Sequence, residues 1–191
     1  MTKIILVRHG EASASWEKSS DPGLSNLGVN QAEECAEILF KFKDIENFDL
    51  KSSPLKRALE TGEKLKTKLK KRLSIDSTYA EIPSPGVSFK NRQKWLKEIF
   101  NKKIDELEKP QKNWRENIIS EIKKIENSTI IFSHFMVINT IVAHAEKNPS
   151  MVCFYPDNCS ITELNKKGNE IELFSLGTVS YTHLTLPTIL P

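Results

Sequence analysis

The segment Lys3-Ile4-Ile5-Leu6-Val7-Arg8-His9 decides the fold of this chain of 191 residues. Its four consecutive apolar, largely β-branched residues predict a strand that is buried on both faces, as in a parallel sheet. A second run of this kind, at 128–133, leads directly into His134 and an apolar helical stretch at 136–145. Two buried strands that each end in a histidine are therefore the starting point for both the fold and the site.

The remaining patterns alternate between helix and strand. Apolar residues at helical spacing predict helices at 26–42 and 53–69, the second opened by Ser53-Pro54, and two amphipathic helices around Trp95 and Trp114. Short strands are expected at 48–52, 73–76, 159–164 and 170–176. Alternating strands and helices indicate βαβ units, so the predicted class is α/β, a three-layer α/β/α fold with a mostly parallel mixed sheet.

The composition is that of an ordinary globular protein, with 38% hydrophobic and 28% charged residues. We expect residues 1–178 to form a single domain with a helical insertion at about 88–126. No apolar run approaches the roughly 20 residues that span a bilayer, and no signal peptide is visible. We therefore expect a cytoplasmic protein without a membrane partner. The net charge of +3 comes without a basic stripe, which argues against nucleic-acid binding.

The cysteines and the end of the chain need separate interpretation. Cys35, Cys153 and Cys159 lack the paired spacing of a zinc or redox motif, and we interpret them as reduced core residues. Residues 179–191 resemble a translated sequencing-adapter sequence and lie in a stretch without charged residues. We therefore treat this tail as non-native and set His183 aside, the alternative being a genuine terminal extension.

Four basic side chains are expected at one edge of the sheet. Ligands of open parallel sheets bind beyond the carboxyl ends of the strands, where His9 and His134 lie. Arg8 adjoins His9, and Arg57 falls in the first turn of the helix after the second strand. Arginine forks match phosphate oxygens, and the free N–H groups of a helix start also favour an anion. The sequence therefore predicts a pocket for a phosphate dianion.

The chemistry of such a pocket follows from the residue types. A neutral imidazole is a competent nucleophile, so His9 would take the phosphoryl group. Arg8, Arg57 and a protonated His134 would stabilise the charge on its oxygens. Glu81 is expected to protonate the leaving group, with Glu11 as the alternative. No metal-ligand spacing is present, and no cofactor is implied.

Two of these residues, Arg57 and His134, also have a purely structural interpretation. Arg57 could be a surface residue that pairs with Glu60 one helical turn away. His134 could serve only as the cap of the helix that follows it. His144, ten residues further along, is expected to be a structural histidine.

Four segments in order resemble the signature motifs of the histidine phosphatase superfamily, which includes phosphoglycerate mutase-like phosphatases. They are Leu6-Val7-Arg8-His9-Gly10-Glu11, Leu24-Ser25-Asn26-Leu27-Gly28-Val29-Asn30-Gln31-Ala32, Ser53-Pro54-Leu55-Lys56-Arg57-Ala58-Leu59-Glu60-Thr61-Gly62 and Ser133-His134. The resemblance covers about residues 3–176 and implies a phosphoglycerate mutase-like fold.

The resemblance also implies roles for single residues. His9 would become phosphohistidine, while Arg8, Arg57 and His134 form the phosphate pocket and Glu81 donates the proton. Ser15 lies where many members place a further phosphate contact. Phe135 departs from the glycine that is common after the second histidine; its N–H can still donate, but its ring adds bulk at the rim.

We therefore expect a phosphatase that hydrolyses a phosphate monoester or phosphoamide. The alternatives are phosphoglycerate mutase-type transfer, which normally needs longer insertions than the one at 88–126, and a non-catalytic binder of phosphorylated ligands. The substrate is expected to be a phosphorylated small molecule or a phosphoprotein. Closure of the pocket by the helices around Trp95 and Trp114 would favour a small molecule.

Overall fold

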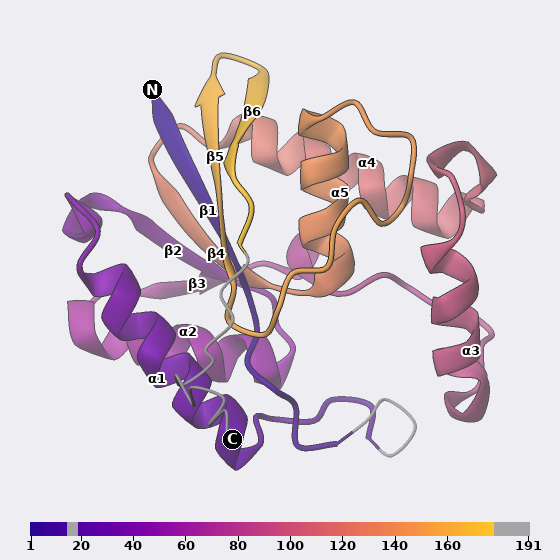
Figure 1. Ribbon diagram of the computed structural model, residues 1–191, viewed down its shortest axis with the longest axis horizontal. Coiled ribbons are helices and arrows are strands. Elements are labelled where there is room, and N and C mark those ends of the chain that lie inside the picture. Colours follow the sequence, from indigo (N-terminus) through magenta and orange to yellow (C-terminus); the bar gives the residue numbers. More distant parts are fainter. Residues whose placement is uncertain (15–18, 178–191) are drawn as a thin grey trace, which may run out of the picture.

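The computed structural model describes residues 1–14 and 19–177, and its centre is a six-stranded sheet in the order β3-β2-β4-β1-β5-β6 (Figure 1). The strands are β1 (Thr2–Arg8), β2 (Asp49–Ser52), β3 (Leu73–Ile75), β4 (Thr129–Ser133), β5 (Ile161–Lys167) and β6 (Glu170–Ser175). The pairs β1–β4, β2–β4 and β2–β3 are parallel, whereas β5 and β6 are antiparallel to their neighbours. The predicted α/β class with a mixed sheet is confirmed.

Helices cover both faces of this sheet and complete the three layers. They are α1 (Asn26–Phe40), α2 (Lys56–Leu69), α3 (Phe89–Phe100), α4 (Lys109–Lys124) and α5 (Phe135–Ala145), with short 3-10 turns at Ile45–Asn47, Ser77–Tyr79 and Ile104–Glu106. In Figure 1, α1 and α2 lie together on one side of the sheet, α4 and α5 on the other, and α3 stands apart. None of the helices within these ranges is long and apolar enough to cross a membrane.

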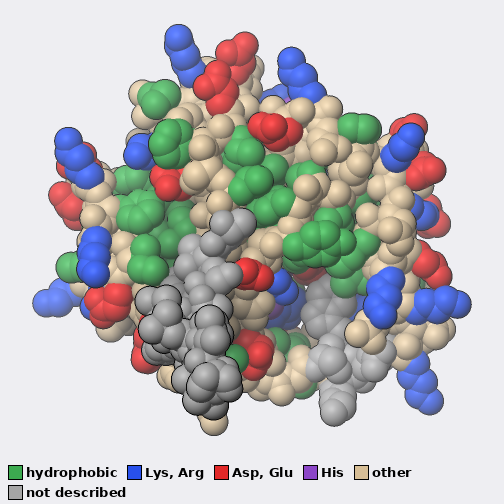
Figure 2. Space-filling model, viewed as in Figure 1, with side chains coloured by type: hydrophobic (Ala, Val, Ile, Leu, Met, Phe, Trp, Pro, Cys, Tyr) green, Lys and Arg blue, Asp and Glu red, His purple; other side chains and the backbone are tan. Residues whose placement is uncertain are grey.

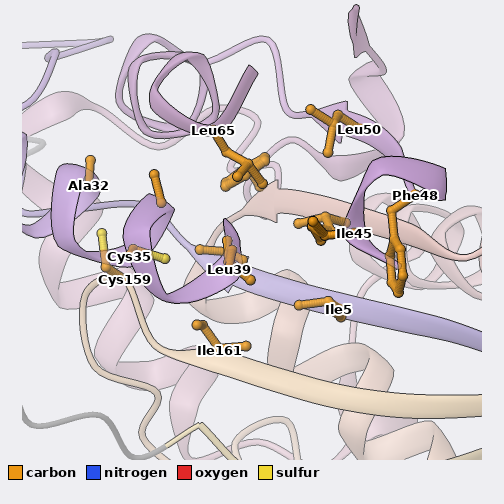
Figure 3. Packing of buried hydrophobic residues seen from close by; sticks show 14 residues of the cluster. Ile5, Ala32, Cys35, Leu39, Ile45, Phe48, Leu50, Leu65, Cys159 and Ile161 are labelled. Carbon is orange, nitrogen blue, oxygen red and sulfur yellow. The ribbon is translucent and has the colours of Figure 1, made fainter. Parts of the chain in front are cut away.

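The alternation of side chains along β1 explains why the strand is apolar on both faces. Ile5 and Val7 pack with α1 and α2 in one core, which includes Leu39 and Leu65 (Figure 3). Ile4 and Leu6 point into the other core, with α4 and α5. Each strand residue therefore removes its side chain from water on one side or the other, which is the main stabilising contribution.

The segment 88–126 contains two helices that pack differently. Ile118 and Ile122 of α4 are fully buried in the core against the sheet. The α3 helix contributes Ile99 to a smaller cluster that includes Met136 of α5. The α3 helix therefore lies beside the start of α5, next to the edge of the sheet where the site is expected.

The start of α2 differs from the sequence-based prediction. The helix begins at Lys56 and not at Pro54, and its N-cap residue is Leu55. Ser53 accepts a hydrogen bond from the backbone N–H of Leu55 at 3.2 Å, but its hydroxyl is also 2.7 Å from the ring of His134. Ser53 is therefore part of the site and not the cap of the helix.

Candidate active site

His9 follows β1 directly and is held in one orientation by two hydrogen bonds. Its Nδ1 lies 2.7 Å from the carbonyl oxygen of Gly10, which can only accept, so Nδ1 carries the proton. Its Nε2 accepts a 2.9 Å hydrogen bond from Nε of Arg57. The second nitrogen of His9 therefore presents its lone pair beside a fixed cation.

The surroundings also set the charge of His9. Burial lowers the pKa of His9 well below the ordinary value, and the positive charges of Arg57 and Arg8 lower it further. The hydrogen bond to Gly10 raises this pKa, but its effect is smaller than those of burial and Arg57. His9 is therefore a neutral imidazole at pH 7, which is the form that can attack phosphorus.

The loop after His9 is fixed by residues of the second and third signature segments. The N–H of Gly10 donates to the hydroxyl of Thr61 at 3.1 Å. The N–H of Glu11 donates to Oε1 of Gln31 at 2.8 Å, and its carbonyl accepts from the N–H of Ser25 at 2.9 Å. Residues far apart in sequence therefore hold the backbone on which the position of His9 depends.

Arg57 is buried, so its interpretation as a surface residue is wrong. Only 1% of Arg57 is exposed, and Glu60 instead accepts a 2.6 Å hydrogen bond from the N–H of Leu24. Burial is the main cause that lowers the pKa of Arg57, while Glu81 and Asp21 raise it. Because an arginine keeps its proton even when buried, Arg57 brings a full positive charge to His9.

Arg8 is the last residue of β1 and lines the same cavity as His9 and Arg57. Its Nη1 donates to the carbonyl oxygen of Pro156 at 2.7 Å, and burial lowers its pKa while Glu81 and Asp157 raise it. Its Nε is buried and has no hydrogen-bond partner among the described residues. The geometry thus leaves Arg8 with a donor for an anionic ligand.

His134 at the end of β4 meets His9, with ring centroids 5.2 Å apart. It occupies the N-cap position of α5, but its side chain makes no capping hydrogen bond. Its interpretation as a mere helix cap is therefore wrong. Its Nε2 pairs with the hydroxyl of Ser53, and its buried Nδ1 has no partner within the described part of the chain.

The expected positive charge on His134 is not supported by its environment. Burial lowers the pKa of His134 well below the ordinary value, and His9, Arg57 and Arg8 lower it further. His134 is therefore neutral before a substrate arrives. Because the Ser53 hydroxyl can donate to Nε2, Nδ1 can carry the proton and offer an N–H to a phosphate oxygen.

Glu81 has the environment of a proton donor, and Glu11 does not. Burial raises the pKa of Glu81, and this outweighs the N–H of Ile82, which donates to its Oε1 at 3.0 Å. Glu11 is exposed and accepts a 2.7 Å hydrogen bond from Ser25. Both line the same cavity, but Glu81 is the one that desolvation favours in its protonated form.

A cavity of about 520 Å³ is lined by Arg8, His9, Arg57 and the two glutamates, and it lies within the usual size range of small-molecule sites. His134 is fully buried and is not among the described lining residues; it adjoins the cavity through its contact with the ring of His9. Figure 2 shows basic atoms deep in a hollow of this face and hydrophobic side chains along its rim. The described lining residues are Arg8, His9, Glu11, Ala12, Arg57, Glu81, Gln93, Leu96, Phe100, Phe135, Tyr155 and Asn158. The structure thus brings together the predicted phosphate-binding residues and Phe135. Ser15 lies outside the described residues.

The lining residues that come from α3 and from the segment after α5 were not assigned to the site from the sequence. Gln93, Leu96 and Phe100 come from α3, and Tyr155 comes from the segment after α5. Helical spacing on α3 could have indicated its apolar face, but nothing in the sequence places that face over His9. Of the two tryptophan helices, only α3 supplies described lining residues; Trp114 of α4 donates to the carbonyl of Ala80 at 3.0 Å.

His144 and the three cysteines are not among the described residues that line this cavity. His144 lines a separate surface cavity with Arg115 and Lys147. The three cysteines are free thiols. Within residues 1–14 and 19–177, no group of histidines, cysteines and carboxylates could hold a metal ion.

A neutral histidine beside two arginines, in a cavity that also contains a carboxyl group with a raised pKa, is suited to chemistry on phosphate esters. The family model of the histidine phosphatase superfamily (branch 1) matches residues 4–178, and the chain belongs to this superfamily. It is a phosphatase. The superfamily resemblance of the four sequence segments is thereby confirmed.

Solved structures of phosphatases share this fold. Phosphoserine phosphatase from Entamoeba histolytica, in complex with 3-phosphoglyceric acid, is 24% identical with a TM-score of 0.71, and the match covers 94% of this chain and 98% of the other. A histidine-to-alanine variant of that enzyme with phosphoserine is 27% identical with a TM-score of 0.69, covering 93% and 98%. Mycobacterial glucosyl-3-phosphoglycerate phosphatase is 18% identical with a TM-score of 0.69, covering 94% and 100%. No curated protein matches the chain at a significant level.

Proposed function

We propose that the enzyme hydrolyses phosphate monoesters in two steps through a phosphohistidine at Nε2 of His9. The observation that carries the proposal is the pair of hydrogen bonds that fixes His9, with Gly10 on Nδ1 and Arg57 on Nε2. Because Nδ1 carries the proton, Nε2 is the ring nitrogen of His9 that has a lone pair for attack on phosphorus.

In the first step, Nε2 of His9 forms a bond to phosphorus while the bond from phosphorus to the ester oxygen breaks. Arg57 releases Nε2 and turns its donors to the phosphoryl oxygens, joined by Arg8 and by Nδ1–H of His134. Glu81 gives its proton to the leaving alcohol oxygen. The products are the free alcohol, a phosphohistidine and the Glu81 carboxylate.

In the second step, water attacks the phosphohistidine. The Glu81 carboxylate takes one proton from the water as its oxygen bonds to phosphorus, and the bond from phosphorus to Nε2 breaks. Inorganic phosphate leaves, and both His9 and Glu81 return to their starting protonation states. One acid and one nucleophile therefore serve both halves of the reaction.

Several features bear on the substrate and the location. The helix α3 borders the cavity through Leu96 and Phe100, which favours a phosphorylated small molecule over a phosphoprotein. Two of the similar structures are of phosphoserine phosphatase, and one of these is a histidine variant that holds phosphoserine. We retain the cytoplasm as the proposed location and residues 1–178 as the proposed domain.

The test is to trap the intermediate. Rapid quenching of the enzyme with a phosphate monoester should give protein whose mass is increased by one phosphoryl group, on a peptide that contains His9. His9→Ala should lose both this species and turnover, whereas His144→Ala should keep both, because His144 lines a different cavity. Full turnover by His9→Ala would contradict the proposal. A protein that binds phosphate but never turns over would be a binder and not an enzyme.

A further inference from the structure

Phe135 connects the phosphate-binding half of the cavity to an aromatic wall. Its ring stacks on Phe100, with centroids 5.0 Å apart and planes at 20°, and it meets Tyr155 at 5.6 Å and 55°. The guanidinium carbon of Arg8 also lies 5.5 Å from the centroid of this ring. An ester bound at His9 would thus begin at Arg8 and extend along this wall.

The aromatic wall, formed by Phe100, Phe135 and Tyr155, is accessible to a ligand. Phe100 and Phe135 are half-buried, and 71% of Tyr155 is exposed although its ring touches Phe135. Leu96 extends the apolar surface within the same cavity. An apolar ligand that covers these rings would release water from them, which is favourable, and stacked or tilted ring contacts add to this.

The charges around the cavity disfavour an anionic leaving group. The described lining residues include two cations, Arg8 and Arg57, and both lie beside His9, where the phosphoryl group would bind. The exposed carboxyl group of Glu11 lines the same cavity, and Glu81 adds a second carboxylate there once it has given its proton to the leaving group. Arg92 of α3 donates from Nε to the hydroxyl of Ser84 at 3.0 Å and is not among the described lining residues, although its charge is close enough to lower the pKa of Arg57. Among the described lining residues, a carboxylate on the leaving group would therefore meet aromatic rings and Glu11, and no cation other than the two arginines that hold the phosphoryl group.

We infer that the preferred substrates are phosphate monoesters of small, uncharged alcohols that carry an aromatic ring. The inference rests on the proposed hydrolysis at His9 and adds the class of leaving group. The ring of the alcohol lies against the aromatic wall, and its oxygen lies within reach of Glu81.

The substrates for the test must differ in binding and not in reactivity. Ethyl phosphate, 2-cyclohexylethyl phosphate, 2-phenylethyl phosphate and phosphoserine all release primary alcohols, so leaving-group acidity varies little. We expect kcat/KM for 2-phenylethyl phosphate to exceed that for ethyl phosphate at least about tenfold. It should also exceed the value for the cyclohexyl ester by about threefold, because ring contacts contribute beyond buried area. Phosphoserine should be the poorest of the larger esters.

Variants of the aromatic wall supply the second part of the test. Phe100→Leu and Tyr155→Ala should each lower the ratio of kcat/KM for the phenylethyl and ethyl esters by about threefold. A ratio measured on one preparation is independent of the fraction of folded enzyme. Phe174→Leu is the matched control, because Phe174 is 65% exposed and does not line this cavity; the ratio should not change.

The outcomes separate the inference from the proposed function. Equal kcat/KM for the phenylethyl and ethyl esters, or a preference for phosphoserine, overturns the inference and leaves hydrolysis at His9 intact. A phenylethyl ester no better than the cyclohexyl ester overturns the aromatic assignment. A phosphotyrosine peptide cleaved faster than phenyl phosphate overturns the choice of small alcohols. If none of the esters is hydrolysed, the proposed function and the inference both fail.

Discussion

Nε of Arg57 donates a 2.9 Å hydrogen bond to Nε2 of His9, the nitrogen that attacks phosphorus in the proposed mechanism. The bond aligns the nucleophile, but it also occupies the lone pair that must react. The substrate has to draw the guanidinium away from Nε2 onto its own oxygens, which carry more negative charge. In the free enzyme, Arg57 therefore orients His9 and adds to the effect of burial, the main cause of the lowered pKa of His9. In the proposed complex, Arg57 binds the phosphoryl group.

The first prediction concerns the removal of the Arg57 charge. Arg57→Gln should reduce kcat/KM by about 10²–10³, because a charged donor to the transition state is lost. The pKa of His9 should rise, since the Arg57 charge is one of the causes that lower it. NMR titration of the His9 ring measures the second effect. Arg115→Gln, outside the cavity, should leave both quantities unchanged, and an unaltered His9 titration in Arg57→Gln would disprove the coupling.

The second prediction concerns the pH dependence that Glu81 imposes. Its pKa is raised by burial, and only the protonated acid can assist the leaving group. Activity towards alkyl phosphates should therefore fall as the pH rises through this raised pKa. Glu81→Gln should lower kcat by about 10²–10⁴ and remove this limb of the profile.

The choice of substrate gives this second prediction its control. The leaving group of 4-nitrophenyl phosphate needs little protonation. Glu81→Gln should therefore slow the release of 4-nitrophenol in the first step much less than it slows the release of an alkyl alcohol. Glu11→Gln should retain the limb for both substrates, because Glu11 is exposed. Equal losses for good and poor leaving groups would rule out Glu81 as the acid of the first step.

The third prediction concerns Ser53, which positions His134 and does not cap α2. Ser53→Ala removes the partner of Nε2, so that the tautomer with Nδ1–H is no longer fixed. We expect about a tenfold loss of kcat with a stability loss of about 1 kcal/mol. Ser52→Ala removes a buried hydrogen bond to the Ser53 carbonyl instead. It should cost similar stability but leave kcat near that of the parent; similar kcat losses in both variants would show that Ser53 is only structural.

The strand ends and the main site residues could be predicted from the sequence because they depend on local patterns. A buried apolar run followed by His9 or His134 indicates both a strand and the edge where ligands bind. The burial of Arg57 could not be predicted, because an arginine in a first helical turn has the same pattern whether it faces water or a site. Its burial depends on how α2 packs against β4, which is a tertiary contact.

The charge of His134 and the position of the aromatic wall could not be predicted from the sequence, for a related reason. Desolvation dominates the pKa of His134, and burial of a polar residue leaves no periodic signal. Phe100 ends one helix, and Tyr155 lies in an irregular segment. Their contacts with Phe135 depend on the conformation of two loops. Such irregular segments have no periodic sequence pattern from which their conformation could be predicted.

The last prediction concerns Gly28, which lets α1 approach the loop that carries the site. A Cβ added at Gly28 would lie 2.1 Å from the carbonyl oxygen of Glu11, a backbone atom that cannot move alone. Gly28→Ala should therefore displace the loop after His9, although alanine is normally the better helix former. We expect a stability loss of about 2 kcal/mol, seen as a decrease in Tm of about 4–8 °C, together with a lower kcat. Asn30→Ala, at an exposed position of the same helix, should retain both Tm and kcat. A Gly28→Ala protein as stable and active as Asn30→Ala would show that the close approach of α1 is not required for catalysis.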